Sequence, residues 1–259
     1  MSKIATRESY GNAVTELGKE NPNIVVLDAD LAGATKSGVF KKAFPERHFN
    51  AGIAETDMVC LAAGLSLAGK IPFVSTFAVF GTGRAYDAVR NAVCYPNLNV
   101  KLALTHAGLT VGEDGATHQM LEDIALMNAL PNMTVIVPAD DTEARQVVKA
   151  AVEINGPVFM RFARAATPVV FGDDYKFEIG KAATIKEGND VTLIACGIMV
   201  QKALEAADEL AKEGINARVI NMATIKPLDK DAVIKAAKET GAIVTCEEHS
   251  IYGGLGSVV

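Results

Sequence analysis

The sequence predicts an α/β protein in which a doubly wound parallel sheet is followed by a second, smaller α/β domain that looks truncated. The chain has 259 residues, a length at which two domains are the first expectation. Hydrophobic residues make up 49% of the chain and charged residues 22%, so a large core can be buried. Short runs rich in Val, Ile and Leu alternate with segments of helical periodicity, which predicts a parallel sheet covered by helices.

The first domain is predicted to span residues 1–165. Its strands should be short apolar runs without two-residue alternation, because helices cover both faces of such a sheet. The runs that meet this description are residues 23–27, 71–76, 100–105, 133–137 and 158–162. The helices predicted around them from apolar spacing are residues 7–19, 55–68, 82–93, 120–129 and 142–154.

The periodicity weakens over residues 166–188, which contain Pro, Gly and paired Asp residues and are predicted to form a linker with a short hairpin. Alternation resumes in a second domain predicted at residues 189–259. Its predicted strands are residues 191–195, 217–221 and 242–246, and its predicted helices are residues 200–212 and 230–238. The chain stops on two valines shortly after the segment YGGLG, so we expect this domain to be incomplete.

The chain is acidic, with 25 Lys and Arg against 31 Asp and Glu, and this balance argues against nucleic-acid binding. Its apolar stretches fall short of the ~20 residues that span a membrane, and the N-terminus lacks the apolar core of a secretory signal. Four widely spaced cysteines with no CxxC pair indicate neither a zinc site nor a disulfide framework. We therefore expect a cytoplasmic protein that binds neither nucleic acid nor membrane.

Several polar and aromatic residues follow predicted strands, at the edge where open α/β sheets bind ligands. In chain order they are Asp28, Asp30, Phe77, Phe80, His106, Arg161 and Arg164. The chain has neither a GxGxxG motif after a strand nor a P-loop, so the usual nucleotide fingerprints are absent.

The segment at residues 105–119, THAGLTVGEDGATHQ, is the richest candidate site. It contains two of the four histidines, two acids and three glycines. Histidine is suited to proton transfer near neutral pH, and glycine allows close ligand approach, so a site is favoured over a merely solvated loop. A metal site built from His106, Asp114 and His118 is a rival interpretation, although no recognised ligand spacing supports it.

The other candidates have plainer interpretations when each is taken alone. Glu55 begins a predicted helix, where a carboxylate commonly compensates the helix dipole. Phe77 and Phe80 are more often core residues at this spacing, and the glycine-rich turn beside them only modestly raises the chance of a stacking surface. Arg7, Arg161 and Arg164 could bind phosphate, but each arginine taken alone more often forms a surface ion pair.

A series of segments, taken in order, resembles the C-terminal half of transketolase over residues 4–164. They are ATRESYGNAV, LDADLAGAT, NAGIAETDMV, FVSTFAVFGTGRAYDAVR, THAGLTVGEDGATHQ, LPNMTVIVPAD and MRFAR. GEDGATHQ is the most specific of them. The second domain resembles the family's C-terminal domain more loosely, through VTLIACG, ARVINMATIKPLD and CEEHSIYGGLG.

The resemblance implies a thiamine-diphosphate enzyme that transfers a two-carbon ketol unit from a ketose phosphate to an aldose phosphate in the pentose phosphate pathway. The family holds the diphosphate, with Mg²⁺ or another divalent cation, in a separate domain whose GDG…N signature this chain lacks. The chain therefore resembles the C-terminal subunit of a split transketolase that is active only with an N-terminal partner subunit. The implied assembly contains two copies of each subunit, and this chain supplies no metal ligand.

The resemblance also implies roles for individual residues. Glu55 is the catalytic residue that would hydrogen-bond N1′ of the aminopyrimidine, favouring the imino tautomer that takes the proton from C2 of the cofactor. His118, also catalytic, would contact the substrate's reacting oxygens, and Asp114 would bind a substrate hydroxyl. The other implied residues are Asp30 beside the cofactor and dimer interface, Phe77 and Phe80 in the pyrimidine pocket, and Arg7, His106 and Arg164 in a sugar-phosphate clamp.

Three alternatives remain. 1-Deoxy-D-xylulose-5-phosphate synthase shares the RAYD and THQ features but commonly has AEQH where this chain has AETD. The beta subunit of 2-oxoacid dehydrogenases lacks the GEDGATHQ loop. A non-catalytic assembly subunit would share the fold, since fold does not fix function, but the retention of Glu55, His118 and Arg164 counts against it. Two positions depart from some family members: Gly83 replaces a third aromatic residue, and Ala34 replaces a phosphate-binding serine.

Overall fold

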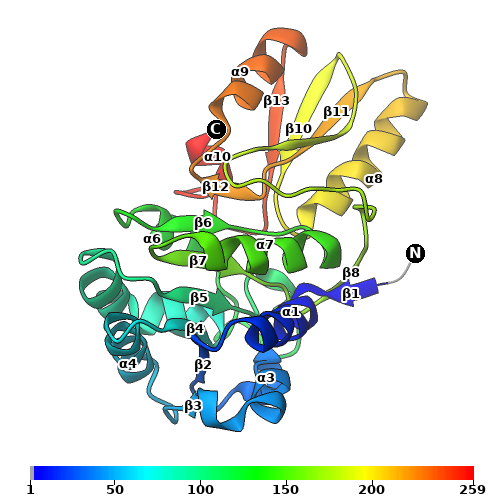
Figure 1. Cartoon of the computed structure of the whole chain (residues 1–259). Helices are drawn as coiled ribbons and strands as arrows, with labels where there is room; N and C mark the ends of the chain where they lie inside the picture. The colour runs from blue at the N-terminus through cyan, green and yellow to red at the C-terminus, as the bar shows by residue number, and fades with distance from the viewer. Residues whose placement is uncertain (1–2) are drawn as a thin grey trace.

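The computed structural model describes residues 3–259 and shows a smaller sheet stacked above a larger one (Figure 1). The strands are β1 (Lys3–Ala5), β2 (Ile24–Asp28), β3 (His48–Asn50), β4 (Ile71–Ser75), β5 (Lys101–Leu104), β6 (Thr134–Ile136), β7 (Val158–Arg161), β8 (Ala166–Pro168), β9 (Ala183–Lys186), β10 (Val191–Ala195), β11 (Ala217–Asn221), β12 (Thr224–Lys226) and β13 (Ile243–Cys246). The α-helices are α1 (Thr6–Glu20), α2 (Ala32–Thr35), α3 (Gly38–Ala43), α4 (Glu55–Leu67), α5 (Tyr86–Ala88), α6 (Asp123–Asn128), α7 (Asp141–Glu153), α8 (Met199–Lys212), α9 (Lys230–Glu239) and α10 (Leu255–Val258). Short 3-10 and π-helical turns are η1 (Pro45–Arg47), η2 (Val79–Arg84), η3 (Val89–Cys94) and η4 (Leu109–Val111).

The large sheet has the strand order β12-β6-β7-β5-β4-β2-β3, and its neighbouring strands are parallel except for β12 with β6. Helices α1, α3 and α7 pack on one face, around Tyr10, Phe40 and Val147. Helices α4 and α6 pack on the other face, around Met58 and Ile124. Strand β2 is buried at every residue, which explains why no alternation marks it in the sequence. The predicted doubly wound parallel sheet is confirmed, and each of the five predicted strands is present.

The helix predicted at residues 82–93 is wrong in its detail. The segment instead forms the π-helical turns η2 and η3 on either side of α5. A Cβ atom on Gly81 would lie 2.6 Å from Cδ1 of Leu104, so the missing side chain lets this segment pack tightly against β5. Such π-helical turns often occur at functional sites, and η2 carries Phe80 and Arg84.

The hairpin predicted within residues 166–188 is also wrong. Strand β8 pairs antiparallel with β1, and β9 pairs antiparallel with β11, so the two short strands lie in different sheets. Each of the two strands pairs with a strand that is distant in the sequence. Turn residues indicate only local pairing, so they cannot reveal such contacts. Elements α2, α3 and β3 were not predicted, because segments of three to six residues give no clear periodicity.

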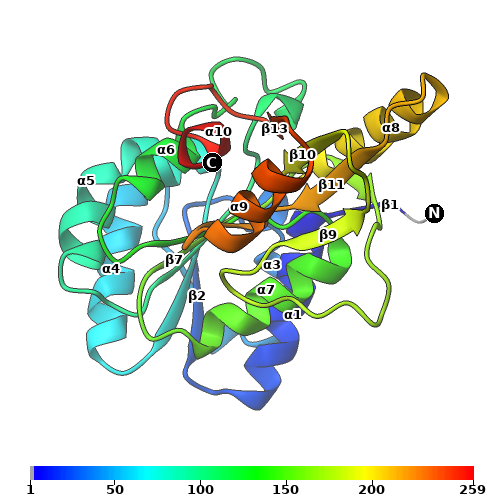
Figure 2. The same cartoon turned by 90° about the horizontal axis from the view of Figure 1, so that it is seen from above.

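The second domain has a mixed four-stranded sheet of order β13-β10-β11-β9, in which only β9 is antiparallel. Its three strands and two helices predicted from the sequence are all present. Strand β12 leaves this domain and joins the large sheet, where the Val137 amide donates to the Ala223 carbonyl at 2.7 Å. Seen from above, α10 and the end of the chain lie beside α6 of the first domain (Figure 2). The predicted boundaries at residues 165 and 189 remain predictions.

Within residues 3–259, no helix is both long enough and apolar enough to cross a membrane. The four cysteines are free thiols in the described part of the chain. Cys246 ends β13 and lies opposite Ala195, the last residue of β10, whereas Cys196 follows β10.

Candidate active site

The predicted site residues gather at the carboxyl edge of the large sheet. Asp30 follows β2, Phe77 follows β4, His106 follows β5 and Arg164 follows β7. A further bridge links Phe77 to Thr105 beyond the ends of β4 and β5 and extends this edge. The topology therefore brings together residues that are more than 130 positions apart in the chain.

Phe77, Phe80 and two histidines form an aromatic cluster. The rings of Phe77 and His106 stack at 3.8 Å between centroids, and those of Phe77 and Phe80 at 5.9 Å. His118 lies edge-on to both phenylalanines, at 5.5 Å from Phe80 and 6.1 Å from Phe77. The π-helical turn η2 and the loop at residues 105–119, called the site loop below, thus build one wall.

Glu55 lies at the first residue of α4 and is only 2% exposed. It borders a cavity of about 350 Å³ that is also lined by Ala29, Asp30, Leu31, Ile53, Phe80 and Arg84. Burial to this degree goes beyond what dipole compensation at an exposed helix end requires, because an ionised carboxylate is costly to remove from water.

Arg84 is a site residue that the sequence reasoning missed. Its Nη1 donates to Oε2 of Glu55 at 2.9 Å, and its guanidinium carbon lies 4.5 Å from the centroid of the Phe80 ring. The side chain is 52% exposed, so it covers Glu55 from the solvent side. A buried carboxylate needs a cationic partner, and this need was the one signal that the sequence offered. The sequence did not indicate which cation would be that partner.

Asp30 lies on the rim of the same cavity, in the left-handed region with φ 61°. Its amide donates to Oδ1 of Asn50 at 3.1 Å, and Nδ2 of Asn50 donates back to its carboxylate at 3.3 Å. The neighbouring Asp28 is fully buried and pairs with His48 at 2.9 Å. Asp30 is therefore available to a ligand, whereas Asp28 stabilises the β2–β3 edge.

Arg7 and His106 form a hydrogen-bonded pair deep in the site. Nη1 of Arg7 lies 3.1 Å from Nε2 of His106 and also donates to the Ala34 carbonyl at 3.0 Å. Because arginine only donates, Nε2 must accept, and the imidazole proton lies on Nδ1, which donates to Thr105 Oγ1 at 2.8 Å. Burial, and then the positive charge of Arg7, lower the pKa of His106 to about 4, so this imidazole is neutral at pH 7.

Arg164 lies just after the end of β7 and hydrogen-bonds to the site loop. Its Nη1 donates to the Val111 carbonyl at 2.9 Å, and its Nη2 pairs with the Glu113 carboxylate. Burial, and then the positive charge of Arg164, lower the pKa of Arg7, which indicates that both guanidinium groups face one region. Asp114 is exposed on the site loop and acts on the same region, since its charge opposes the lowering of the pKa of Arg7.

Arg161, a further cation at a strand end, has a structural role. It is 7% exposed, and its Nε donates to Oδ2 of Asp123 at 2.7 Å. Among residues 3–259, no group of three or more His, Cys, Asp or Glu side chains could hold a metal ion, and this includes the trio His106, Asp114 and His118. The described residues therefore give no support to the rival metal interpretation of the site loop.

Comparisons with known proteins agree with this geometry. The transketolase pyrimidine-binding domain family matches residues 2–169, and the transketolase C-terminal domain family matches residues 180–259. Together these matches cover most of the chain.

Similar proteins carry related names. A Methanocaldococcus jannaschii protein named as a transketolase C-terminal section is 50% identical over 98% of this chain and 80% of its own length. A subunit of the apulose-4-phosphate transketolase of Phocaeicola vulgatus is 41% identical over 99% of this chain and 82% of its own length. A solved structure described as a split-gene transketolase, inactive β4 tetramer, has 58% identity and a TM-score of 0.92 over 99% of this chain and 84% of that chain. The chain therefore belongs to the transketolase family and consists of its pyrimidine-binding and C-terminal domains, as in the C-terminal section of a split transketolase.

Proposed function

We propose that the chain is the C-terminal subunit of a thiamine-diphosphate-dependent transketolase that transfers a two-carbon ketol unit from a ketose phosphate to an aldose phosphate. The names of two relatives describe transketolase subunits for apulose 4-phosphate and for 6-deoxy-6-sulfo-D-fructose. Both sugars carry an anionic group, which supports an anionic ketose as the donor. The pentose phosphate pathway and the cytoplasm are the setting that we propose for the reaction.

The observation that carries this proposal is the buried Glu55 carboxylate beside a wall formed by Phe80. An aminopyrimidine presents a flat face that an aromatic ring can stack on, together with ring nitrogens that a carboxyl group can hydrogen-bond. The dry surroundings of Glu55 strengthen such a bond by lowering the local dielectric constant. The residues present therefore fit the pyrimidine half of thiamine diphosphate.

Arg84 contacts the same two groups that a bound pyrimidine would use. Its exposed side chain can turn outward without disturbing the core, because it lies at the solvent side of the cavity. Arg84 thus gives the buried Glu55 carboxylate a partner when no ligand is bound. A bound pyrimidine would compete with Arg84 for Glu55.

Thiamine diphosphate, when bound, supplies the electron-sink chemistry of ketol transfer. The chain's own groups divide the remaining work. Glu55 holds a proton at N1′ of the pyrimidine, and His118, at the edge of the aromatic wall, holds or accepts a proton at the reacting oxygens of the sugar. Arg7 and Arg164 attract the terminal anion, Asp114 accepts from a sugar hydroxyl, and the neutral His106 orients Arg7.

The diphosphate and its Mg²⁺ or other divalent cation are assigned to an N-terminal partner subunit. Residues 3–259 offer no cluster of three metal-ligating side chains, and the two family matches are to the pyrimidine-binding and C-terminal domains. We propose an assembly with two copies of each subunit. The similar solved structure is described as an inactive tetramer of β chains, which supports the expectation that this chain alone does not turn over substrate.

The test is reconstitution. The purified chain is assayed with xylulose 5-phosphate, ribose 5-phosphate, thiamine diphosphate and magnesium, with and without a candidate N-terminal subunit. Turnover is expected only in the mixture, and native mass spectrometry should show two copies of each subunit. Turnover by the chain alone would disprove the split-subunit proposal. Release of carbon dioxide from pyruvate and glyceraldehyde 3-phosphate by the mixture would instead identify a deoxyxylulose-phosphate synthase.

A further inference from the structure

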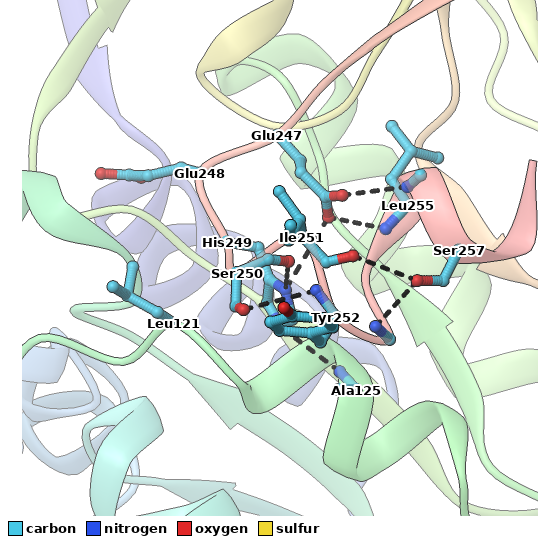
Figure 3. Close-up of polar contacts among 12 residues, drawn as sticks. Leu121, Ala125, Glu247, Glu248, His249, Ser250, Ile251, Tyr252, Leu255 and Ser257 are labelled. Carbon is cyan, nitrogen blue, oxygen red and sulfur yellow. Dashed lines mark hydrogen bonds and ion pairs between the residues drawn. The ribbon is translucent and has the colours of Figure 1, made fainter.

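Glu248 reaches from the second domain into the first. It follows β13, is 8% exposed, and accepts hydrogen bonds from the Thr110 amide at 2.5 Å and from Thr110 Oγ1 at 3.3 Å. Figure 3 shows the Glu248 side chain pointing away from Glu247, His249 and Leu255, which contact one another or their neighbours on the other side of the loop. Glu248 is thus turned toward the site loop and not into its own domain.

The site loop is shaped to receive this carboxylate. Gly108 has φ +79°, and a Cβ atom at that position would overlap the carboxyl group of Glu248. The Gly108 amide also donates to the Met120 carbonyl at 2.9 Å, which closes the base of the loop. Only a residue without a side chain lets the loop backbone approach the carboxylate this closely.

The main chain of Glu248 is held as firmly as its side chain. Nη2 of Arg161 donates to the Glu248 carbonyl at 2.9 Å, while Nε of the same guanidinium binds the buried Asp123 carboxylate. A buried cation with both contacts fixes where Glu248 emerges from the second domain. This explains why a strand-end arginine close to the site is not free to bind substrate.

The short turn η4, which includes Thr110, is held from two sides. Glu248 binds Thr110, and Arg164 binds the Val111 carbonyl. Asp114 and His118 lie on the same loop just beyond this turn. We propose that Glu248 is a positioning residue through which the second domain sets the placement of Asp114 and His118 against the aromatic wall.

The kinetic part of this inference rests on the proposed function, but its first measurement does not. In the full chain, Glu248→Ala should speed amide hydrogen exchange of Thr110 and of the rest of the site loop about tenfold, as expected for loss of one charge-assisted hydrogen bond. Glu248→Gln should restore part of the protection, since its amide oxygen can still accept from Thr110. Unchanged exchange in Glu248→Ala would overturn the proposal, whether or not the assembled enzyme is active.

Glu247→Gln is the matched control. Glu247 is the adjacent residue, and its carboxylate binds the Leu255 amide at 2.6 Å and the Gly256 amide at 2.9 Å. This variant should leave site-loop exchange at the wild-type rate. An equal rise in exchange for Glu247→Gln and Glu248→Ala would contradict the proposal. It would mean that general loosening of the second domain, and not loss of the Glu248 contact, sets the exchange rate of the site loop.

In the reconstituted enzyme, Glu248→Ala should raise KM for the sugar substrates about tenfold, with a smaller fall in kcat, and Glu248→Gln should lie between wild type and Glu248→Ala. Binding of thiamine diphosphate should be unchanged, because Glu55 and Phe80 belong to other elements. Weaker cofactor binding in Glu248→Ala would contradict a role confined to the site loop.

Discussion

The Glu55 cavity and the site loop lie at the same edge of one sheet, yet they are built differently. The cavity is made by the start of α4, by η2 and by the residues after β2, all within the first 84 residues. The site loop is held by Arg164 from the end of β7 and by Glu248 from the second domain. The proposed cofactor end of the site is therefore built within the first domain, whereas the proposed substrate end depends on distant contacts.

This difference indicates which part of the site can vary. Substitutions near Glu55 disturb a buried carboxylate and its only described cationic partner, Arg84, so they should affect every substrate alike. Substitutions around the site loop change the separate contacts that Arg164 and Glu248 make with it. Each contact can be altered without the other, so such substitutions should affect some sugars more than others. The following predictions test that contrast, beginning with the largest expected effect.

Glu55→Gln in the assembled enzyme should slow the reaction of every donor by about 10²–10³, or roughly 2.7–4 kcal/mol of barrier. The near-isosteric amide keeps the shape of the cavity but cannot hold the N1′ proton in the same way. The measurement is exchange of the C2 proton of bound thiamine diphosphate, followed by NMR, with circular dichroism as a check on folding. A wild-type exchange rate in Glu55→Gln would rule out the role proposed for Glu55.

Arg164→Ala should raise KM for xylulose 5-phosphate by about one to two decades, because it removes the guanidinium that we propose attracts the terminal phosphate. Hydroxypyruvate, a donor without a phosphate, should be affected much less. The comparison is kcat/KM for the two donors in wild type and variant.

Glu113→Gln is the control for Arg164, because it removes the ion pair but leaves the guanidinium in place. It should keep the preference for the phosphorylated donor. Equal losses for both donors in Arg164→Ala would mean that Arg164 serves only to hold Val111 and the loop.

Arg84→Met should tighten binding of thiamine diphosphate to the assembled enzyme by a few-fold, because no guanidinium then competes for Glu55 and Phe80. The same variant should lower the stability of the free chain by about 1 kcal/mol or less, since an ion pair with one exposed partner contributes little. Calorimetric titration measures the first effect and urea unfolding the second. Weaker cofactor binding would show that Arg84 assists the pyrimidine and does not compete with it.

The last prediction concerns pH. His106 has a pKa of about 4 in the folded chain, against an ordinary value of 6.5, because burial and the Arg7 charge disfavour the cation. The unfolded chain therefore binds more protons between these values, and the free energy of unfolding contributed by His106 falls as the pH drops from about 6.5 to 4. In His106→Gln, the difference in urea-unfolding free energy between pH 7 and pH 5 should be smaller than in wild type. An unchanged difference would mean that His106 is freely protonated in the fold.

Much of the fold could be predicted from the sequence because its strands are continuous apolar runs and its longer helices are periodic. The helical periodicity also placed Glu55 at the start of a helix. The two histidines of the site loop could be recognised as a cluster directly from their spacing in the sequence. The contact of Arg84 with Glu55 could not be predicted, because the chain has seven other arginines and no local pattern links any one arginine to Glu55. The contact between Thr110 and Glu248 joins residues 138 positions apart, and no local pattern marks either residue.

The two wrong predictions about local structure have one physical cause. A helix was expected at residues 82–93 because the spacing there is helical, but Gly81 packs against Leu104 and the backbone adopts π-helical turns. A hairpin was expected after residue 165 because turn residues are frequent, but β8 and β9 pair with strands formed far away in the chain. In both cases tertiary packing outweighed a correctly read local preference.

Strand β12 ties the two domains together, because it pairs with β6 at the edge of the large sheet. It belongs by sequence to the second domain but is hydrogen-bonded to β6, and Nζ of Lys226 donates to the Leu130 carbonyl at 2.6 Å, beyond the end of α6. We therefore expect that a chain cut by a protease between β8 and β9 would leave two fragments that stay associated. Expressing residues 1–165 alone would expose the edge of β6 as an unpaired strand, a surface prone to aggregation.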